Sequence, residues 1–127
     1  MAGAQQPEHK LDGVSLRPLL QGQSKQTRDA LVMHVPAYNG SEGRKNIIDP
    51  FFQTPCTVVW RENYKYVRNY EPDREDELFD LDADIGEQNN LAKSHPEILS
   101  EMSKQMDKWV KDNQAALPQP LETSMIR

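Results

Sequence analysis

The chain has 127 residues, of which 36% are hydrophobic and 28% charged, and its net charge is −5 at pH 7. These values fit one modest globular domain with a thin core, and part of its apolar surface is expected to belong to a core shared with another segment. The acidic balance argues against a nucleic-acid surface, and no apolar run reaches the length of a membrane span or a signal peptide.

The N-terminal stretch, residues 1–27, predicts one short helix between irregular segments. Ser15 is placed to cap a helical turn over residues 16–20, and Gly22 is placed to end it. Pro18 is compatible with this turn because it lies near the helix start. The leucines of the turn are expected to form its buried face: Leu16, Leu19 and Leu20.

Apolar and aromatic runs separated by turn residues predict a small antiparallel sheet of about four strands. The first strand is expected within residues 28–36. A hairpin is expected around the Glu62-Asn63 pair, with Asn63 as the residue that tolerates a positive φ. A second turn at residues 71–74 leads into an extended run at residues 77–81.

The segment after Leu91 predicts an amphipathic helix. Residues 94–97 have the pattern of a capping box with a proline in the first turn, and an Asp107–Lys111 pair is expected on the solvent face. The apolar residues that recur at helical spacing are Ile98, Leu99, Met102, Met106, Trp109 and Val110. The predicted fold is therefore α+β, a small antiparallel sheet packed against one C-terminal amphipathic helix.

Acidic residues alternate after the last predicted strand, at Asp80, Asp82 and Asp84. This alternation suggests a calcium loop, but Ile85 stands where an EF-hand needs glycine, and Leu91 stands where it needs a bidentate glutamate. We therefore expect a solvated loop with Asx turns. The three histidines, His9, His34 and His95, are too scattered to predict a zinc site.

Basic and aromatic residues of the hairpin are expected to be structural. Arg61, Lys65 and Arg68 are expected to be solvated or to pair with acids. Tyr64, Tyr66 and Tyr70 are expected to pack in the core or across strands, although a sugar platform is the alternative. Residues 37–55 lack periodicity and predict a long loop, in which Arg44 and Lys45 could contact an anionic ligand.

A family resemblance rests on the string ELFDLDADIGEQNNL, from Glu77 to Leu91. It resembles the "ELYDL…DPGEQNNL" pattern of the C-terminal subdomain of the sulfatases, with Ile85 where proline is usual. Further similar strings run from Asp12 to Leu16 and from Arg61 to Lys65, and the resemblance covers about Ala2 to Leu117.

The resemblance implies a division of the chain and a larger protein around it. Residues 1–27 resemble a linker and short helix at the end of a catalytic subdomain, residues 28–117 resemble the C-terminal subdomain, and residues 118–127 are expected to be a tail. Met1 is then expected to lie within a longer enzyme. Relatives are commonly periplasmic or secreted, but this sequence carries no signal peptide and leaves the compartment open.

The activity implied is that of a sulfuric ester hydrolase with a modified cysteine or serine nucleophile and a calcium ion. Cys56 does not fit the nucleophile's Cys-x-Pro-x-Arg setting, because Val58 and Trp60 stand at the required positions, and a buried structural cysteine is expected. No catalytic residue, metal ligand or cofactor is therefore expected in this chain. Calcium is expected in a full-length relative, and the chain alone is expected to be inactive.

The expected partners are the catalytic subdomain and, through it, a sulfated small molecule or glycan, with neither nucleic acid nor membrane. His34 and Pro36 resemble part of the family's His-aromatic-Pro-His segment, with Ala37 replacing the second histidine. This favours His34, Arg44 and Lys45 as substrate-binding residues at the pocket rim. A hydrogen-bonded strand-end histidine is the alternative for His34.

Two alternatives remain for the whole chain. One is a stand-alone binding or interaction module derived from the sulfatase fold. The other is a truncated, non-functional product with an exposed sheet face, which would be poorly soluble.

Overall fold

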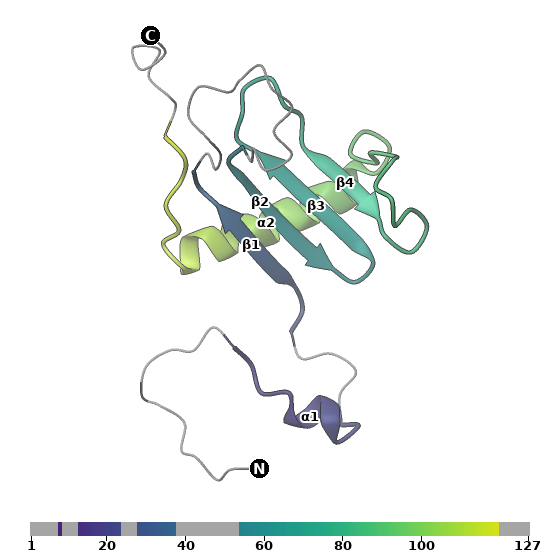
Figure 1. Ribbon diagram of the computed structural model, residues 1–127, viewed down its shortest axis with the longest axis vertical. Coiled ribbons are helices and arrows are strands. Elements are labelled where there is room, and N and C mark those ends of the chain that lie inside the picture. Colours follow the sequence, from purple (N-terminus) through teal and green to yellow (C-terminus); the bar gives the residue numbers. More distant parts are fainter. Residues whose placement is uncertain (1–7, 9–12, 24–27, 38–53, 120–127) are drawn as a thin grey trace.

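The computed structural model describes residue 8 and residues 13–23, 28–37 and 54–119. It confirms the predicted α+β architecture, with four strands preceding a long C-terminal helix (Figure 1). None of the helices in these ranges is long and apolar enough to cross a membrane. The elements are α1 (Arg17–Leu20), β1 (Leu31–Val35), β2 (Cys56–Arg61), β3 (Tyr64–Asn69), β4 (Glu77–Asp80) and α2 (Pro96–Asp112).

The strands form one antiparallel sheet in the order β1-β2-β3-β4. The β2–β3 hairpin turns at the predicted residues, but Glu62 carries the positive φ, at 54°. The expectation of a positive φ at Asn63 was wrong. Asn63 instead makes two hydrogen bonds to the end of β4. Its side-chain amide donates to Asp80 Oδ1 at 2.8 Å, and its carbonyl accepts the Leu81 N–H at 2.8 Å. Asn63 thereby joins the hairpin to the end of β4.

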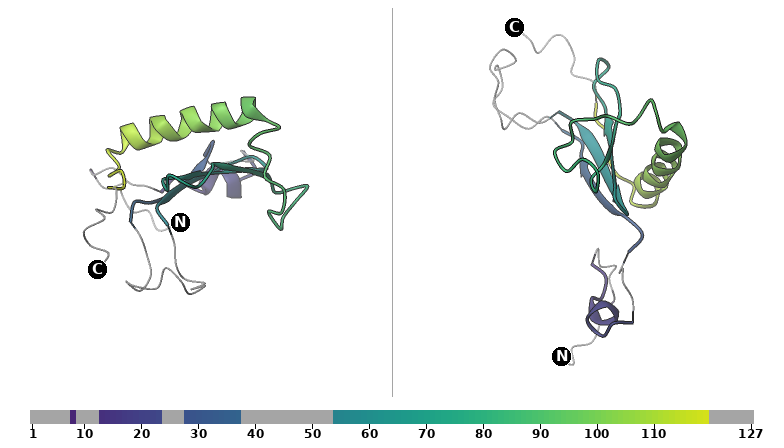
Figure 2. Two further views of the ribbon diagram at one scale, coloured as in Figure 1. Left: turned by 90° about the horizontal axis from the view of Figure 1, so that it is seen from above. Right: turned by 90° about the vertical axis from the view of Figure 1, so that its right-hand side faces the viewer.

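Helix α2 lies across one face of the sheet and builds the core against it (Figure 2). Side chains on one face of a strand recur every second residue, and those on one face of a helix recur every three or four. The sheet and the helix therefore each contribute a short row of buried side chains. The fully buried members of this core are Val59, Tyr66, Leu78, Met102 and Met106.

The predicted capping box at the start of α2 was wrong. The N-cap residue is His95, and it makes no side-chain cap hydrogen bond. Ser94 lies one residue before the N-cap. It belongs to the preceding turn, in which the His95 N–H bonds the Leu91 carbonyl at 2.9 Å. Ser94 Oγ donates to the same carbonyl at 3.2 Å. Proline at the first helical position still suits this start, since its missing N–H is not needed there.

Helix α1 forms where it was expected, but its leucines are not buried. The N-cap residue is Leu16, without a side-chain cap, so the predicted cap at Ser15 was wrong, although Ser15 Oγ accepts the Arg17 N–H at 3.3 Å. Gly22 adopts a φ of 67° just after the turn. No residue of α1 is buried, so the predicted buried face was wrong for the described residues. The apolar residues left exposed in and beside α1 are Val14, Leu16, Leu19 and Leu20.

The outer edge of β4 is closed by the EQNNL string. The Leu78 N–H donates to Asn90 Oδ1 at 3.0 Å, and the Leu78 carbonyl accepts the Leu91 N–H at 2.7 Å. Asn90 Nδ2 also donates to the Asp76 carbonyl at 3.2 Å. The side chain of Asn90 therefore takes the place of a neighbouring strand's backbone along the middle of β4.

The face of the sheet opposite α2 is largely apolar as well, and we call it the far face. Strand pairing places Met33, Val58 and Val67 in one row across it. Leu31 and Met33 are 51% and 41% exposed, whereas Cys56, Val58, Val67 and Phe79 are buried. Among the described helices, only α2 lies on the sheet, and it covers the other face (Figure 2). The apolar residues of the far face are Leu31, Met33, Val35, Cys56, Val58, Trp60, Val67 and Phe79, and Lys65, Asn69 and Glu77 lie in the same rows.

Candidate functional site

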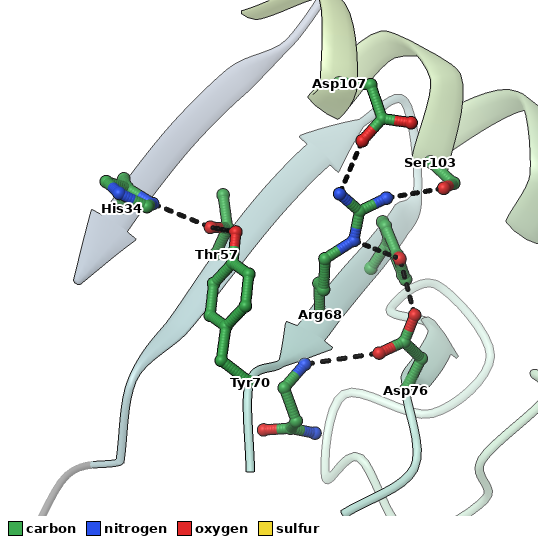
Figure 3. A network of polar contacts seen from close by, with 9 residues as sticks. His34, Thr57, Arg68, Tyr70, Asp76, Ser103 and Asp107 are labelled. Carbon is green, nitrogen blue, oxygen red and sulfur yellow. Dashed lines mark hydrogen bonds and ion pairs between the residues drawn. The ribbon is translucent and has the colours of Figure 1, made fainter. Parts of the chain in front are cut away.

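His34 lies near the end of β1, paired with Thr57 of β2. Its Nδ1 is 2.7 Å from Thr57 Oγ1, and its Nε2 is 2.8 Å from the Ala116 carbonyl oxygen (Figure 3 shows the Thr57 contact). A carbonyl can only accept, so Nε2 carries a proton and donates. In the neutral ring Nδ1 then accepts from the Thr57 hydroxyl. Both ring nitrogens of His34 are thus engaged by the protein's own groups.

Tyr70 extends this contact into a short polar chain. Its hydroxyl is 2.8 Å from Thr57 Oγ1, and Thr57 is fully buried. The hydroxyl of Thr57 can accept from Tyr70 while it donates to His34. The His34 ring also meets the Tyr70 ring edge-on at 6.3 Å between centroids and lies 6.1 Å from the Trp109 ring. We call His34, Thr57 and Tyr70 the end-of-sheet cluster.

The cluster lies where the chain leaves β1 and where it enters β2. The next pair along the two strands is Val35 with Cys56. Just beyond it, the Tyr70 N–H donates to the Pro55 carbonyl at 3.1 Å. Arg44 and Lys45, the other two residues expected at a substrate pocket, lie outside the described residues. The structure therefore places one of the three candidate residues, at the base of the segment that carries the other two.

Thr57, Tyr70 and Ala116 are the members of this site that sequence reasoning missed. Thr57 could have been found by aligning the first strand against the hairpin, because its register partner is His34. Ala116 is 82 residues from His34, and no local pattern connects the two.

Arg68 is the centre of a second polar network, which joins the sheet to α2 (Figure 3). Its guanidinium donates to Asp107 Oδ1 at 2.5 Å, to Ser103 Oγ at 2.6 Å and to the Tyr66 hydroxyl at 3.2 Å. Tyr66 donates in turn to Asp76 Oδ2 at 2.6 Å. Burial, together with this bond to Asp76, raises the pKa of Tyr66 to about 12. The network is internal, and the expected packing role of Tyr66 is confirmed.

The other cations of the hairpin pair with acids, as predicted. Arg61 lies 3.4 Å from Glu101, and Lys65 lies 2.6 Å from Glu87. Asp107 pairs with Arg68, so the predicted Asp107–Lys111 pair is replaced by one across elements.

Cys56 is 8% exposed and packs with Val58 and Val67. Burial raises the pKa of its thiol, which keeps the sulfur protonated at neutral pH. The structure therefore confirms the prediction of a buried packing residue.

The alternating carboxylates after β4 accept hydrogen bonds from neighbouring N–H groups. Asp84 Oδ2 accepts from the Gln88 and Asn89 backbones, each at 2.8 Å. Asp80 Oδ1 accepts from Asn63 and from the Asp82 N–H at 3.1 Å. Within the described ranges no group of three or more potential ligands could hold a metal ion. One carboxylate oxygen of Asp80 and one of Asp84 are thus taken by N–H donors of the same loop and hairpin.

Acid is expected to loosen the loop after β4. The pKa of Asp84 is held below its ordinary value first by the Asn89 N–H, and that of Asp80 first by the Asn63 amide. Carboxylates with a lowered folded-state pKa stabilise the fold above their ordinary pKa of about 3.9, and this contribution is lost as the pH falls through the folded value. When urea unfolding is measured at a series of pH values from 6 downward, the midpoint urea concentration should therefore decrease once the pH is below about 4. Asp84→Asn should make that fall shallower, and an unchanged profile would contradict the assignment.

Comparison with solved structures finds the same fold in a sulfatase. This structure, labelled 6S-sulf, comes from work on the metabolism of multiple glycosaminoglycans by Bacteroides thetaiotaomicron. The TM-score is 0.54 and the sequence identity is 23%, over 82% of this chain. The match covers only 21% of that protein, so this chain spans about a fifth of its length. At this identity the likeness establishes the fold.

The family is established by the sequence itself. Residues 1–114 match the family model described as N-sulphoglucosamine sulphohydrolase, C-terminal. The chain therefore belongs to this sulfatase C-terminal domain family, and the predicted resemblance is confirmed. A search of the curated proteins finds no match.

Proposed function

We propose that this chain is the C-terminal part of a sulfuric ester hydrolase, where it supports a catalytic subdomain and completes the rim of the substrate pocket. The observation that carries this proposal is that the sheet presents apolar side chains on both faces, whereas among the described helices only α2 lies on it, against one face. An antiparallel sheet that faces water on one side normally alternates apolar and polar residues. On β1 and β2 the far face is apolar at every position, and Leu31 and Met33 are exposed there, so this part of the face suits a second layer of protein.

Helix α1 supports the same proposal. Leu16, Leu19 and Leu20 are exposed next to Val14, and a short helix with one apolar side is stabilised mainly by packing against a neighbour. Exposed apolar groups of this kind are typical of interaction surfaces. In the proposed enzyme, the leucines of α1 and the far face both pack against the catalytic subdomain.

The proposed contribution to the substrate pocket comes from the segment between β1 and β2. It carries Arg44 and Lys45, whose cationic groups suit sulfate oxygens, and His34 lies at its base. The substrate class is a sulfated small molecule or glycan. The neighbour from glycosaminoglycan metabolism is consistent with this class.

The chain alone is not expected to hydrolyse sulfate esters. Its sequence has no Cys-x-Pro-x-Arg string, and its one cysteine, Cys56, is buried. The nucleophile is therefore proposed to lie in the catalytic subdomain. The calcium ion that the family resemblance implies is proposed to lie in that subdomain as well, since the described residues hold no group of three or more potential ligands.

The test is association with a catalytic subdomain. The chain would be mixed with the separately expressed catalytic subdomain of a sulfatase from the same family that lacks its own C-terminal part. A one-to-one complex is expected by size-exclusion chromatography with light scattering. Met33→Lys on the far face should weaken the complex about tenfold or more, because it places a charge in an apolar interface.

The matched control is Ser100→Lys, which adds the same charge at an exposed position on α2 and should leave the affinity unchanged. Equal effects of the two variants would contradict docking through the far face. A chain that forms no complex but binds a sulfated sugar by itself would favour the stand-alone binding module. Aryl sulfate turnover by the purified chain with calcium present would overturn the assignment of catalysis to another subdomain.

A further inference from the structure

We infer that His34 is a positioning residue, which ties β1, β2 and the segment after α2 together and so fixes the base of the segment between β1 and β2. This inference deepens the proposed function, because that segment is the proposed pocket rim. In this inference His34 acts by holding the backbone of three segments in place, and its ring nitrogens do not contact the substrate.

The first argument is the use of both ring nitrogens. Nε2 donates to the Ala116 carbonyl and Nδ1 accepts from Thr57, at 2.8 and 2.7 Å. A ligand that hydrogen-bonded to His34 would have to displace one of these partners. Thr57 is fully buried and its hydroxyl would keep only Tyr70 as a partner, and the loss of one of two buried hydrogen bonds destabilises the fold. The geometry therefore favours His34 as a structural junction.

The second argument is the position of the junction. The His34–Thr57 pair is next to the Val35–Cys56 pair, which is the last before the intervening segment. Tyr70 contacts the residues on both sides of Cys56. Its hydroxyl reaches Thr57, and its N–H donates to the Pro55 carbonyl. The points where the chain leaves and re-enters the sheet are thus held together by side chains as well as by strand pairing.

The third argument is the link to the other end of the chain. After α2 ends at Asp112, Gln114 takes a φ of 49° and the Ala115 N–H bonds the Val110 carbonyl at 3.0 Å. This turn brings Ala116 to His34, and the segment runs beside β1 in Figure 1. One imidazole therefore connects the base of the β1–β2 segment to the end of α2.

The two contacts of His34 can be removed separately. In His34→Asn the side-chain amide can occupy the place of Nδ1 and keep the bond to Thr57, whereas the bond to Ala116 is lost. In His34→Gln the longer side chain can reach the Ala116 carbonyl from the place of Nε2, and the bond to Thr57 is lost. His34→Ala removes both contacts.

Amide hydrogen exchange of the intact chain would report on each of the two contacts separately. The Ala115 N–H reports on the turn after α2, and the Tyr70 N–H reports on the base of the segment. His34→Asn should speed exchange at Ala115 roughly tenfold and leave Tyr70 unchanged, since one hydrogen bond is lost locally. His34→Gln should do the reverse, and His34→Ala should speed exchange at both.

The ring itself gives a second readout. Nitrogen NMR of the neutral imidazole should show the proton on Nε2, because that nitrogen donates to a carbonyl. A proton on Nδ1 would overturn the inference, as would identical exchange patterns in His34→Asn and His34→Gln. These measurements need no partner, so they can fail while the complex with a catalytic subdomain forms. Conversely, a confirmed junction without any complex would leave the inference standing and remove the proposed function.

Discussion

Met106→Ala is expected to lower the free energy of unfolding by about 3 kcal/mol. Met106 is fully buried between α2 and the sheet, in contact with the core of Val59, Tyr66 and Leu78. Shortening it removes buried apolar surface and leaves a cavity, because the strands on one side and the helix on the other cannot fully close on the gap. Urea unfolding followed by far-ultraviolet circular dichroism would measure the change.

Met33→Ala is the matched control, since it makes the same chemical change at a residue that is 41% exposed. In the isolated chain it should lower the free energy of unfolding by less than about 1 kcal/mol. Equal losses for the two variants would show that α2 does not close the main core. A loss below about 1 kcal/mol for Met106→Ala would show the same.

Arg68→Met is expected to cost about 2 kcal/mol of stability through the network between β3 and α2. The substitution keeps the aliphatic length of the side chain and removes its donors to Ser103, Asp107 and Tyr66. Asp107 is 63% exposed, so it regains water and accounts for little of the loss. Most of the expected effect comes from the half-buried side, where Ser103 and Tyr66 lose a charged partner. Thermal or urea unfolding at neutral pH would measure it.

Arg61→Met provides the comparison for this prediction. Arg61 also reaches α2, at Glu101, but both side chains are more exposed and the distance is 3.4 Å. Exposed ion pairs contribute little, so this variant should change stability by no more than about 0.5 kcal/mol. If the two arginine variants were equally mild, the Arg68 network would not fasten the helix to the sheet.

The elements that could be predicted from sequence are those with a strong period. The strands around the Glu62-Asn63 turn and helix α2 were found because their apolar residues alternate or recur at helical spacing. The start of α2 was misplaced by one residue, because Ser94 and His95 both donate their N–H groups to the Leu91 carbonyl in a turn that precedes the helix. Period alone does not show which turn directly precedes a helix.

The parts that could not be predicted depend on distant contacts. The leucines of α1 have the spacing of a buried face, but burial also needs a partner surface, which the described residues do not supply. His34 was recognised as a candidate because it ends a strand. Its bond to Ala116 depends on how the whole domain closes, since the two residues are 82 apart in sequence.

The side chain of Asn90 has a consequence for how this domain can associate with itself. It occupies the outward N–H of Leu78, and Leu91 occupies the outward carbonyl, so β4 is a poor template for a strand of another molecule. Strand β1, at the opposite end of the sheet, has no lysine, proline or acidic residue among Leu31–Val35, and the segment after α2 runs beside it. Edge-to-edge pairing of two copies through β1 would require that segment to move and would then stop at a pair, because each copy would end the array with its blocked β4 edge. The string that marks the family thus also limits growth into fibres.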